Sequence, residues 1–176
     1  MKTIVIMDFD GTLIDSPVDV DGREVWKEKT GEEFPHKGWW GKKESLSLDV
    51  FDIQPIEKVL IDYNKHIENG DTVYLVTGRI PKLGDEVRDI LDKHKLTFSK
   101  GVVSKDPFKE LEAPEDGIYL RRSGKSTADF KIKLFNNMVD EENPDKFIIY
   151  EDRFDHVKAF KKWSESVDIP VTINFV

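Results

Sequence analysis

Segments with the hydrophobic pattern of a strand alternate along this chain with segments that have the pattern of a helix. Short β-branched or continuous apolar runs predict strands, and they cover residues 3–7, 72–76, 102–103, 118–120, 147–150 and 171–176. Apolar residues three or four positions apart predict helices, and they cover residues 56–67, 87–95, 130–138 and 157–167. Such alternation is typical of right-handed βαβ units. It predicts an α/β fold with a mainly parallel sheet and helices on both of its faces.

The segment 16–51 has neither pattern and is predicted to be irregular. It contains Pro17, Pro35 and four glycines, which disfavour long regular elements. A chain of 176 residues fits one domain. We therefore expect a single domain over residues 1–176, with a small flap or cap at 16–51 and a second loop insertion at 104–125.

Composition and charge exclude several classes of protein. The absence of cysteine excludes disulfides, thiolate zinc sites and a cysteine nucleophile. A net charge of −8 disfavours non-specific binding to nucleic acid, which normally needs a basic face. No apolar run is long enough to span a membrane, and the N-terminus lacks the pattern of a signal peptide. We expect a cytoplasmic protein with no membrane contact and no obligate protein partner.

Two aspartates follow the first predicted strand. Asp8 and Asp10 are two positions apart and precede Gly11, so their carboxylates can converge on one site. Two charged carboxylates repel each other, and a divalent cation with oxygen ligands, such as Mg²⁺, relieves the repulsion. The pair indicates a nucleophile beside a general acid/base. The alternative is a helix cap or an Asx turn that leads into Gly11.

Two further strands are also followed by polar residues. Thr77 and Gly78 end the second strand, where a hydroxyl and a backbone N–H can hold phosphate oxygens, although Thr-Gly is also common in turns. Glu151 and Asp152 follow the strand at 147–150, where they supply oxygen ligands or cap a helix. Ligands of parallel sheets bind beyond the carboxyl ends of the strands, so we expect the three clusters to meet.

These clusters, in this order, resemble the motifs of the haloacid dehalogenase (HAD) superfamily of aspartate-nucleophile phosphotransferases. The matching segments are Asp8-Phe9-Asp10-Gly11-Thr12, Val76-Thr77-Gly78-Arg79 and Glu151-Asp152. The C-terminal half is similar to the Swiss Army Knife RNA repair-like branch, through Thr127-Ala128-Asp129-Phe130-Lys131 and Tyr150-Glu151-Asp152-Arg153-Phe154-Asp155-His156. The resemblance covers most of the chain outside residues 16–51. It implies a HAD-like, Rossmann-like three-layer α/β/α sandwich.

The resemblance also implies a phosphatase mechanism. Asp8 would attack phosphorus to form an aspartyl phosphate, and Asp10 would protonate the leaving oxygen and then activate water. Thr77 and the Gly78 backbone N–H would bind the phosphoryl oxygens. Mg²⁺ would be held by the Asp8 carboxylate, the Asp10 backbone carbonyl and Asp152. This arrangement suits phosphoryl transfer, which depends mostly on positioning and on charge stabilisation.

Two motif positions leave alternatives open. The lysine that neutralises the nucleophile and the phosphate is expected at Lys131, with Lys125 as the alternative. His156 falls where many relatives carry a second acidic residue, so Glu151 or Asp155 would help to hold the metal. His156 itself would then contact the leaving group or order its loop.

Aromatic and basic side chains suggest how a substrate binds. Trp39 and Trp40 can stack on a base, or they can pack the flap onto the core. Arg79 can bind a second phosphate or pair with the acids. Arg121 and Arg122 would supply a local basic rim.

The sequence thus predicts a Mg²⁺-dependent phosphomonoesterase that acts on a nucleic-acid 3′ end or a nucleotide. A phosphatase or phosphotransferase acting on sugar phosphates or other small metabolites is the second hypothesis. The third is a non-catalytic binding module on the HAD fold.

Overall fold

The computed structural model describes residues 1–102, 113–122 and 124–176, and the main feature of these ranges is a five-stranded parallel sheet. Along the sheet the strands lie in the order β5-β4-β1-β6-β7. Their bounds are Thr3–Met7 for β1, Thr72–Thr77 for β4, Ile118–Leu120 for β5, Lys146–Glu151 for β6 and Val171–Phe175 for β7. Each neighbouring pair is parallel, which confirms the predicted α/β class.

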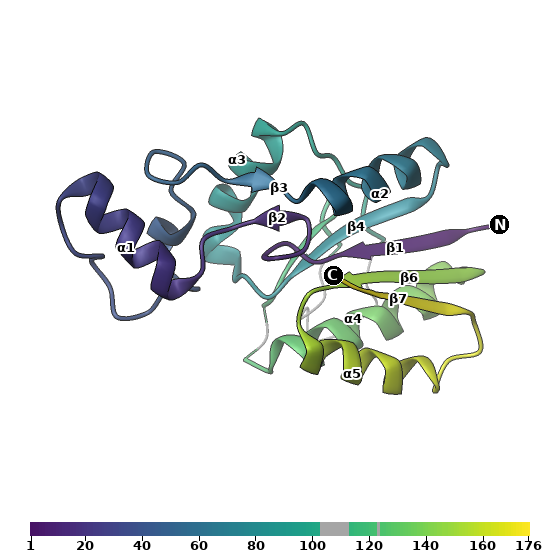
Figure 1. Cartoon of the computed structure of the whole chain (residues 1–176). Coiled ribbons are helices and arrows are strands. Elements are labelled where there is room, and N and C mark those ends of the chain that lie inside the picture. Colours follow the sequence, from purple (N-terminus) through teal and green to yellow (C-terminus); the bar gives the residue numbers. More distant parts are fainter. Residues whose placement is uncertain (103–112, 123) are drawn as a thin grey trace.

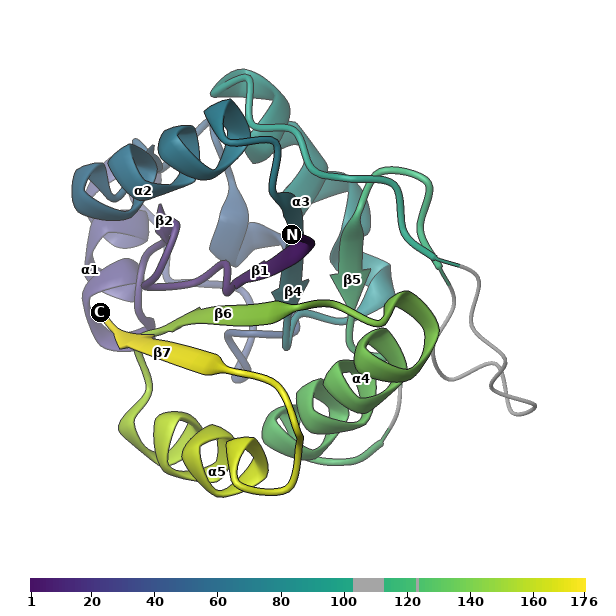
Figure 2. The same cartoon turned by 90° about the vertical axis from the view of Figure 1, so that its right-hand side faces the viewer.

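Two pairs of helices cover the two faces of this sheet (Figure 2). Helices α2 (Glu57–Glu68) and α3 (Gly84–Lys93) lie on one face, and α4 (Thr127–Glu142) and α5 (Phe154–Ser164) lie on the other. Successive residues of a strand point to opposite faces. In β1, accordingly, Val5 and Met7 belong to one hydrophobic core and Ile4 and Ile6 belong to the other. Burial on both faces explains why these strands are continuous apolar runs.

The predicted helices and most predicted strands are present. Helix α4 begins at the N-cap Ser126, whose side chain accepts a hydrogen bond of 3.2 Å from the Asp129 N–H. The exception is the short strand predicted at 102–103: Val102 is not in a strand, and residue 103 lies outside the described residues. Of the second insertion, 104–125, residues 104–112 and 123 lie outside the described residues, and Ile118–Leu120 form strand β5.

The prediction of irregular structure for 16–51 is wrong in part. Residues Asp19–Thr30 form the helix α1, and Lys43–Leu46 form the 3₁₀ helix η1. Within α1 only Gly22 is buried, so the helix carries no wide apolar stripe that periodicity could reveal. Its N-terminal aspartates and C-terminal lysines instead complement the helix dipole.

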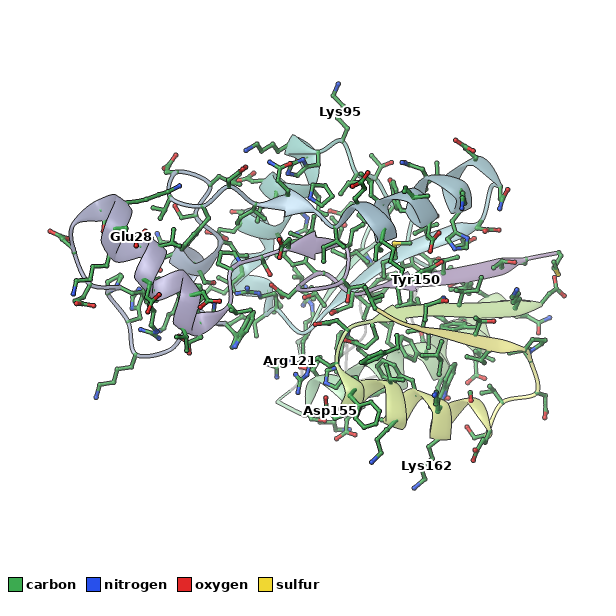
Figure 3. All side chains as sticks on the ribbon, viewed as in Figure 1. Glu28, Lys95, Arg121, Tyr150, Asp155 and Lys162 are labelled. Carbon is green, nitrogen blue, oxygen red and sulfur yellow. The ribbon has the colours of Figure 1, made fainter. Side chains whose placement is uncertain are left out.

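A short antiparallel pair joins the two ends of this segment to the sheet domain. Strand β2 (Ile14–Asp15) pairs with β3 (Gln54–Pro55), so the chain leaves and returns at one place. Residues 16–53, called the insert below, lie beyond the carboxyl ends of the sheet strands (Figure 1). Figure 3 shows Glu28 on α1 at the end of the insert far from Tyr150 in the sheet.

No helix within the described ranges is both long and apolar enough to cross a membrane.

Candidate active site

The carboxyl ends of three neighbouring strands bring the predicted acidic clusters together. Strands β4, β1 and β6 are adjacent in the sheet. Asp8 directly follows β1, while Thr77 and Glu151 are the last residues of β4 and β6. The parallel arrangement predicted from the sequence therefore places them at one edge of the sheet.

A buried lysine lies between two of these acids. Lys131 Nζ donates to Asp8 Oδ1 at 2.8 Å and to Glu151 Oε2 at 3.0 Å. Lys131 is 1% exposed, Glu151 is fully buried and Asp8 is 8% exposed. Lys125, the alternative, is exposed, and its carbonyl accepts a 3.1 Å hydrogen bond from Arg121 Nη1. The start of α4 thus brings Lys131 to the expected nucleophile.

The site contains three acidic side chains, Asp8, Glu151 and Asp152, beside the single buried lysine Lys131. Their pKa values are shifted from the ordinary values in different directions. Burial raises the pKa of Asp8 well above its ordinary value, against the opposing attraction of Lys131. Burial also acts to raise the pKa of Glu151, but Lys131 and His156 outweigh it and hold that pKa well below its ordinary value. The pKa of Asp152 is raised by burial and by the nearby Glu151. One lysine therefore leaves negative charge that a further cation would stabilise.

Three of the acids have the spacing of a metal site. Oxygens of Asp8, Glu151 and Asp152 lie within 4.8 Å of one another. Glu151 is already occupied: Oε2 faces Lys131 and His156 Nδ1, and Oε1 accepts from the backbone N–H groups of residues 152 and 153. Asp8 and Asp152 are the side chains best placed to hold a cation. Their carboxylate oxygens are the ligands that Mg²⁺ prefers, so the site fits this ion.

Two small residues bring Asp152 close to Asp8. Gly11 has φ +69°, and a Cβ there would lie 2.4 Å from Asp152 Oδ2. Only glycine combines this backbone conformation with so close an approach. The buried Thr12 hydroxyl lies 3.3 Å from Asp8 Oδ2 and 3.1 Å from Asp152 Oδ1. Its single proton can serve only one of the two at a time. Thr12 is a site residue to which the sequence analysis gave no role.

Asp10 lies outside this acidic group and pairs with Arg79. Arg79 Nε and Nη2 donate to the two carboxylate oxygens of Asp10 at 2.9 and 2.8 Å. Arg79 is 3% exposed, so the structure shows the pairing alternative rather than an arginine open to a phosphate.

The remaining acidic and imidazole side chains near β6 have structural partners. His156 is buried, and its Nδ1 lies 3.3 Å from Glu151 Oε2. Asp155 is exposed and accepts a 3.0 Å bond from Arg153. Figure 3 shows Asp155 and Arg121 near the middle of the molecule in this view, where α4 and α5 begin.

Thr77 and Gly78 lie against the start of α4. Thr77 is fully buried and its Oγ1 accepts from the Arg79 N–H at 3.1 Å. A Cβ on Gly78 would lie 2.6 Å from Thr127 Oγ1, so a side chain at this position would push the loop away from α4. Thr127 is a further residue near the site. The sequence placed it in the family motif but predicted no role for it.

The two tryptophans have different environments. Trp39 is 3% exposed and its Nε1 donates to the Pro17 carbonyl at 3.1 Å. It therefore packs the insert, and its ring is not available for stacking on a base. Trp40 is 48% exposed, with the Arg79 guanidinium 4.9 Å from its ring centroid.

Comparison with known proteins identifies the family and the fold of this chain. The model of HAD domain family 1 in Swiss Army Knife RNA repair proteins matches residues 25–174. A structure of the Pnkp1/Rnl/Hen1 RNA repair complex aligns with a TM-score of 0.58 and 15% identity, over 99% of this chain and 43% of that one. A second structure of the Pnkp1/Rnl/Hen1 complex gives a TM-score of 0.56 and 16% identity, over 99% and 47%. The chain thus spans less than half the length of these two chains, and at such identity the likeness shows the fold alone.

No curated protein sequence matches the chain. Because the family model covers most of its length, the chain belongs to the HAD domains of Swiss Army Knife RNA repair proteins.

Proposed function

We propose that this domain is a phosphomonoesterase that uses Asp8 as its nucleophile. The observation that carries the proposal is the contact of the buried Lys131 with Asp8 and Glu151, beside Asp152, at the carboxyl ends of the adjacent strands β1 and β6. A buried cation opposes the rise in pKa that burial imposes on an attacking carboxylate, and it reduces the repulsion between that carboxylate and a phosphate. An acidic cluster with no catalytic role would be expected on the exposed surface, where its charges are solvated, rather than buried around a lysine.

The proposed reaction has two steps. An Asp8 oxygen forms a bond to phosphorus while the bond to the leaving oxygen breaks, and that oxygen takes a proton from Asp10, whose carboxylate has first been protonated from solvent. Asp10, now ionised, takes a proton from water, which attacks the aspartyl phosphate and releases phosphate and Asp8. Thr77 and the Gly78 N–H bind the phosphoryl oxygens in this scheme.

A magnesium ion fits the proposal as a cofactor. Asp8 and Asp152 would hold it, together with the backbone carbonyl of Asp10. Bound there, Mg²⁺ would supply charge stabilisation for the phosphoryl group.

We propose a nucleic-acid 3′-phosphate, or the corresponding nucleotide, as the substrate. The family is named for RNA repair proteins, and both aligned structures are of RNA repair complexes. The exposed part of Trp40 is the remaining stacking candidate, because Trp39 is buried. The same comparisons lead us to propose that the domain works beside other repair activities. This revises the expectation that it needs no protein partner.

The test is phosphate release, with Mg²⁺, from an oligoribonucleotide 3′-phosphate and from the matching mononucleotide. We expect Asp8→Asn to abolish release, whereas the exposed Asp89→Asn serves as the matched control and retains it. Preference for the oligonucleotide would support an end-repair phosphatase, and preference for the mononucleotide would support a nucleotidase. Release at the Asp8→Asn level from both would contradict the proposed substrates, and a screen of small phosphate esters would then separate a metabolite phosphatase from a binding module.

A further inference from the structure

Asp10 is held at both of its carboxylate oxygens. Arg79 donates to Oδ2 through Nε at 2.9 Å and to Oδ1 through Nη2 at 2.8 Å. Ser16 Oγ donates to Oδ1 at 2.5 Å. A bidentate guanidinium fixes the plane of a carboxylate as well as its position. The direction of the Asp10 carboxyl group is therefore determined by Arg79 and Ser16.

Arg79 is in turn held by the insert. Its Nη1 donates to the Trp40 carbonyl at 2.7 Å and to Ser45 Oγ at 2.8 Å. The Trp40 ring lies against the same guanidinium, and Ser45 is fully buried. Arg79 itself follows β4, so it bridges the sheet domain and the insert.

The partners of Asp10 and Arg79 come from separate parts of the insert. Ser16 is at its start, while Trp40 and Ser45 lie near η1, and the paired β2 and β3 join the insert to the sheet domain. A shift of the insert would therefore move Arg79 and Ser16 together, and Asp10 with them. Within the described part of the chain, the Asp8 carboxylate instead accepts hydrogen bonds from Lys131 and Thr12, which both lie outside the insert.

We propose that the insert, acting through Arg79, positions Asp10 for proton transfer. Arg79 and Ser45 are then positioning residues, and the insert belongs to the acid/base machinery rather than serving only as a cover. This inference rests on the proposed phosphatase function. Its chemical basis is that a general acid works only within hydrogen-bond reach of the oxygen that it protonates, so a small rotation of the Asp10 carboxyl group slows the step.

The leaving group provides the test, because proton donation matters only when the departing oxygen is strongly basic. When the P–O bond of a ribose 3′-phosphate breaks, the alkoxide needs the Asp10 proton, whereas 4-nitrophenolate leaves without one. The ratio kcat/KM reports only the steps up to the first irreversible one, here the formation of the aspartyl phosphate. It therefore excludes the later step in which Asp10 activates water for both substrates.

We expect Ser45→Ala and Arg79→Lys to lower kcat/KM for the oligonucleotide 3′-phosphate by about tenfold or more, within the range of general acid catalysis. With 4-nitrophenyl phosphate both variants should stay within about threefold of the unmodified protein. Ser47→Ala is the matched control, since Ser47 lies two positions from Ser45 in the same insert. Equal losses on both substrates would show a merely structural role, and no loss, or a gain, would overturn the inference.

A second measurement tests the link without requiring activity. If the insert positions Asp10, then Asp10 must also stabilise the insert, because coupling is reciprocal. Asp10→Asn should speed amide hydrogen exchange in residues 16–53 several-fold, whereas Asp8→Asn should leave exchange there unchanged. Equal exchange in the two variants would overturn the inference. If the unmodified protein hydrolyses neither ester, the proposed function fails, and the exchange result still decides whether the insert and Asp10 are coupled.

Discussion

Lys131 is a single residue on which the charge balance of the site depends. Its ammonium group is buried between Asp8 and Glu151. Taking charges out of water is unfavourable, and a buried pair that loses one partner is destabilised by about 3–5 kcal/mol. A lysine in this position fits the electrostatic role that the proposed reaction needs.

Replacement of the two candidate lysines should distinguish them. We expect Lys131→Ala to lower phosphatase activity by about 100-fold or more, as loss of one electrostatic stabiliser does elsewhere, because Asp8 then faces Glu151 without a cation. Lys125→Ala should change activity little, since this side chain is exposed. Turnover of the oligonucleotide 3′-phosphate by both variants is the measurement, and small, equal losses would contradict the role of Lys131.

Ionisation of Tyr150 should lower the free energy of unfolding at alkaline pH. Burial, together with the nearby Asp62 and Asp71, raises the pKa of Tyr150 from 10.0 to about 12. The folded pKa is thus above the unfolded one, so this contribution to stability is complete below pH 10 and is lost as the pH rises towards 12. We expect the free energy of unfolding to fall more between pH 9 and pH 11 in the unmodified protein than in Tyr150→Phe. Parallel declines in urea unfolding would contradict this.

The insert is an element whose aromatic side chains extend one of the two hydrophobic cores of the sheet domain. Trp39 is packed between Phe34, with ring centroids 4.7 Å apart, and Phe51, at 6.1 Å. Trp26 also contacts Phe34, at 5.2 Å. This aromatic packing explains how a helix as polar as α1 is held in place, since its sequence provides little amphipathic surface.

Gly22 makes this packing possible, because a Cβ there would lie 2.3 Å from the Trp39 ring. Alanine favours a helix by about 1 kcal/mol over glycine, yet overpacking typically costs about 1–3 kcal/mol. We therefore expect Gly22→Ala to destabilise the insert, with faster amide exchange in residues 16–53. Gly41→Ala is the control, because its Cβ would meet nothing within 4 Å. Unchanged exchange in Gly22→Ala would contradict the role of Gly22.

The whole molecule has a net charge of −8. Part of its negative charge is concentrated at the carboxyl ends of β1 and β6, in Asp8, Glu151 and Asp152. A ligand that binds only the folded state stabilises that state in proportion to the logarithm of its concentration. Metal binding at this site should therefore be measurable as a change in global stability.

Mg²⁺ should raise the melting temperature of the unmodified protein. At about 100 times Kd the expected stabilisation is about 2.7 kcal/mol. Asp152→Asn removes one of the two best-placed ligands and should abolish the shift. Asp155→Asn, whose carboxylate is exposed and paired with Arg153, should retain it. A calorimetric scan with and without Mg²⁺ measures this, and equal shifts in the two variants would count against the proposed ligands.

The sequence by itself determined the alternation of strands and helices, and therefore the sheet edge at which Asp8, Thr77 and Glu151 meet. This was readable because strand burial on both faces leaves continuous apolar runs, and because the carboxyl ends of parallel strands lie together. The helix α1 was not readable, since a helix held by a few aromatic contacts has no periodic stripe.

Only the tertiary structure decided which of the candidate side chains lie at the site. Lys131 and Lys125 are six positions apart, and Trp39 and Trp40 are neighbours. Which member of each pair is buried depends on how α4 and the insert pack. The pairing of Arg79 with Asp10, Trp40 and Ser45 joins three distant parts of the chain. Contacts of this kind depend on how whole helices, strands and loops pack against one another. Local sequence patterns therefore do not predict them.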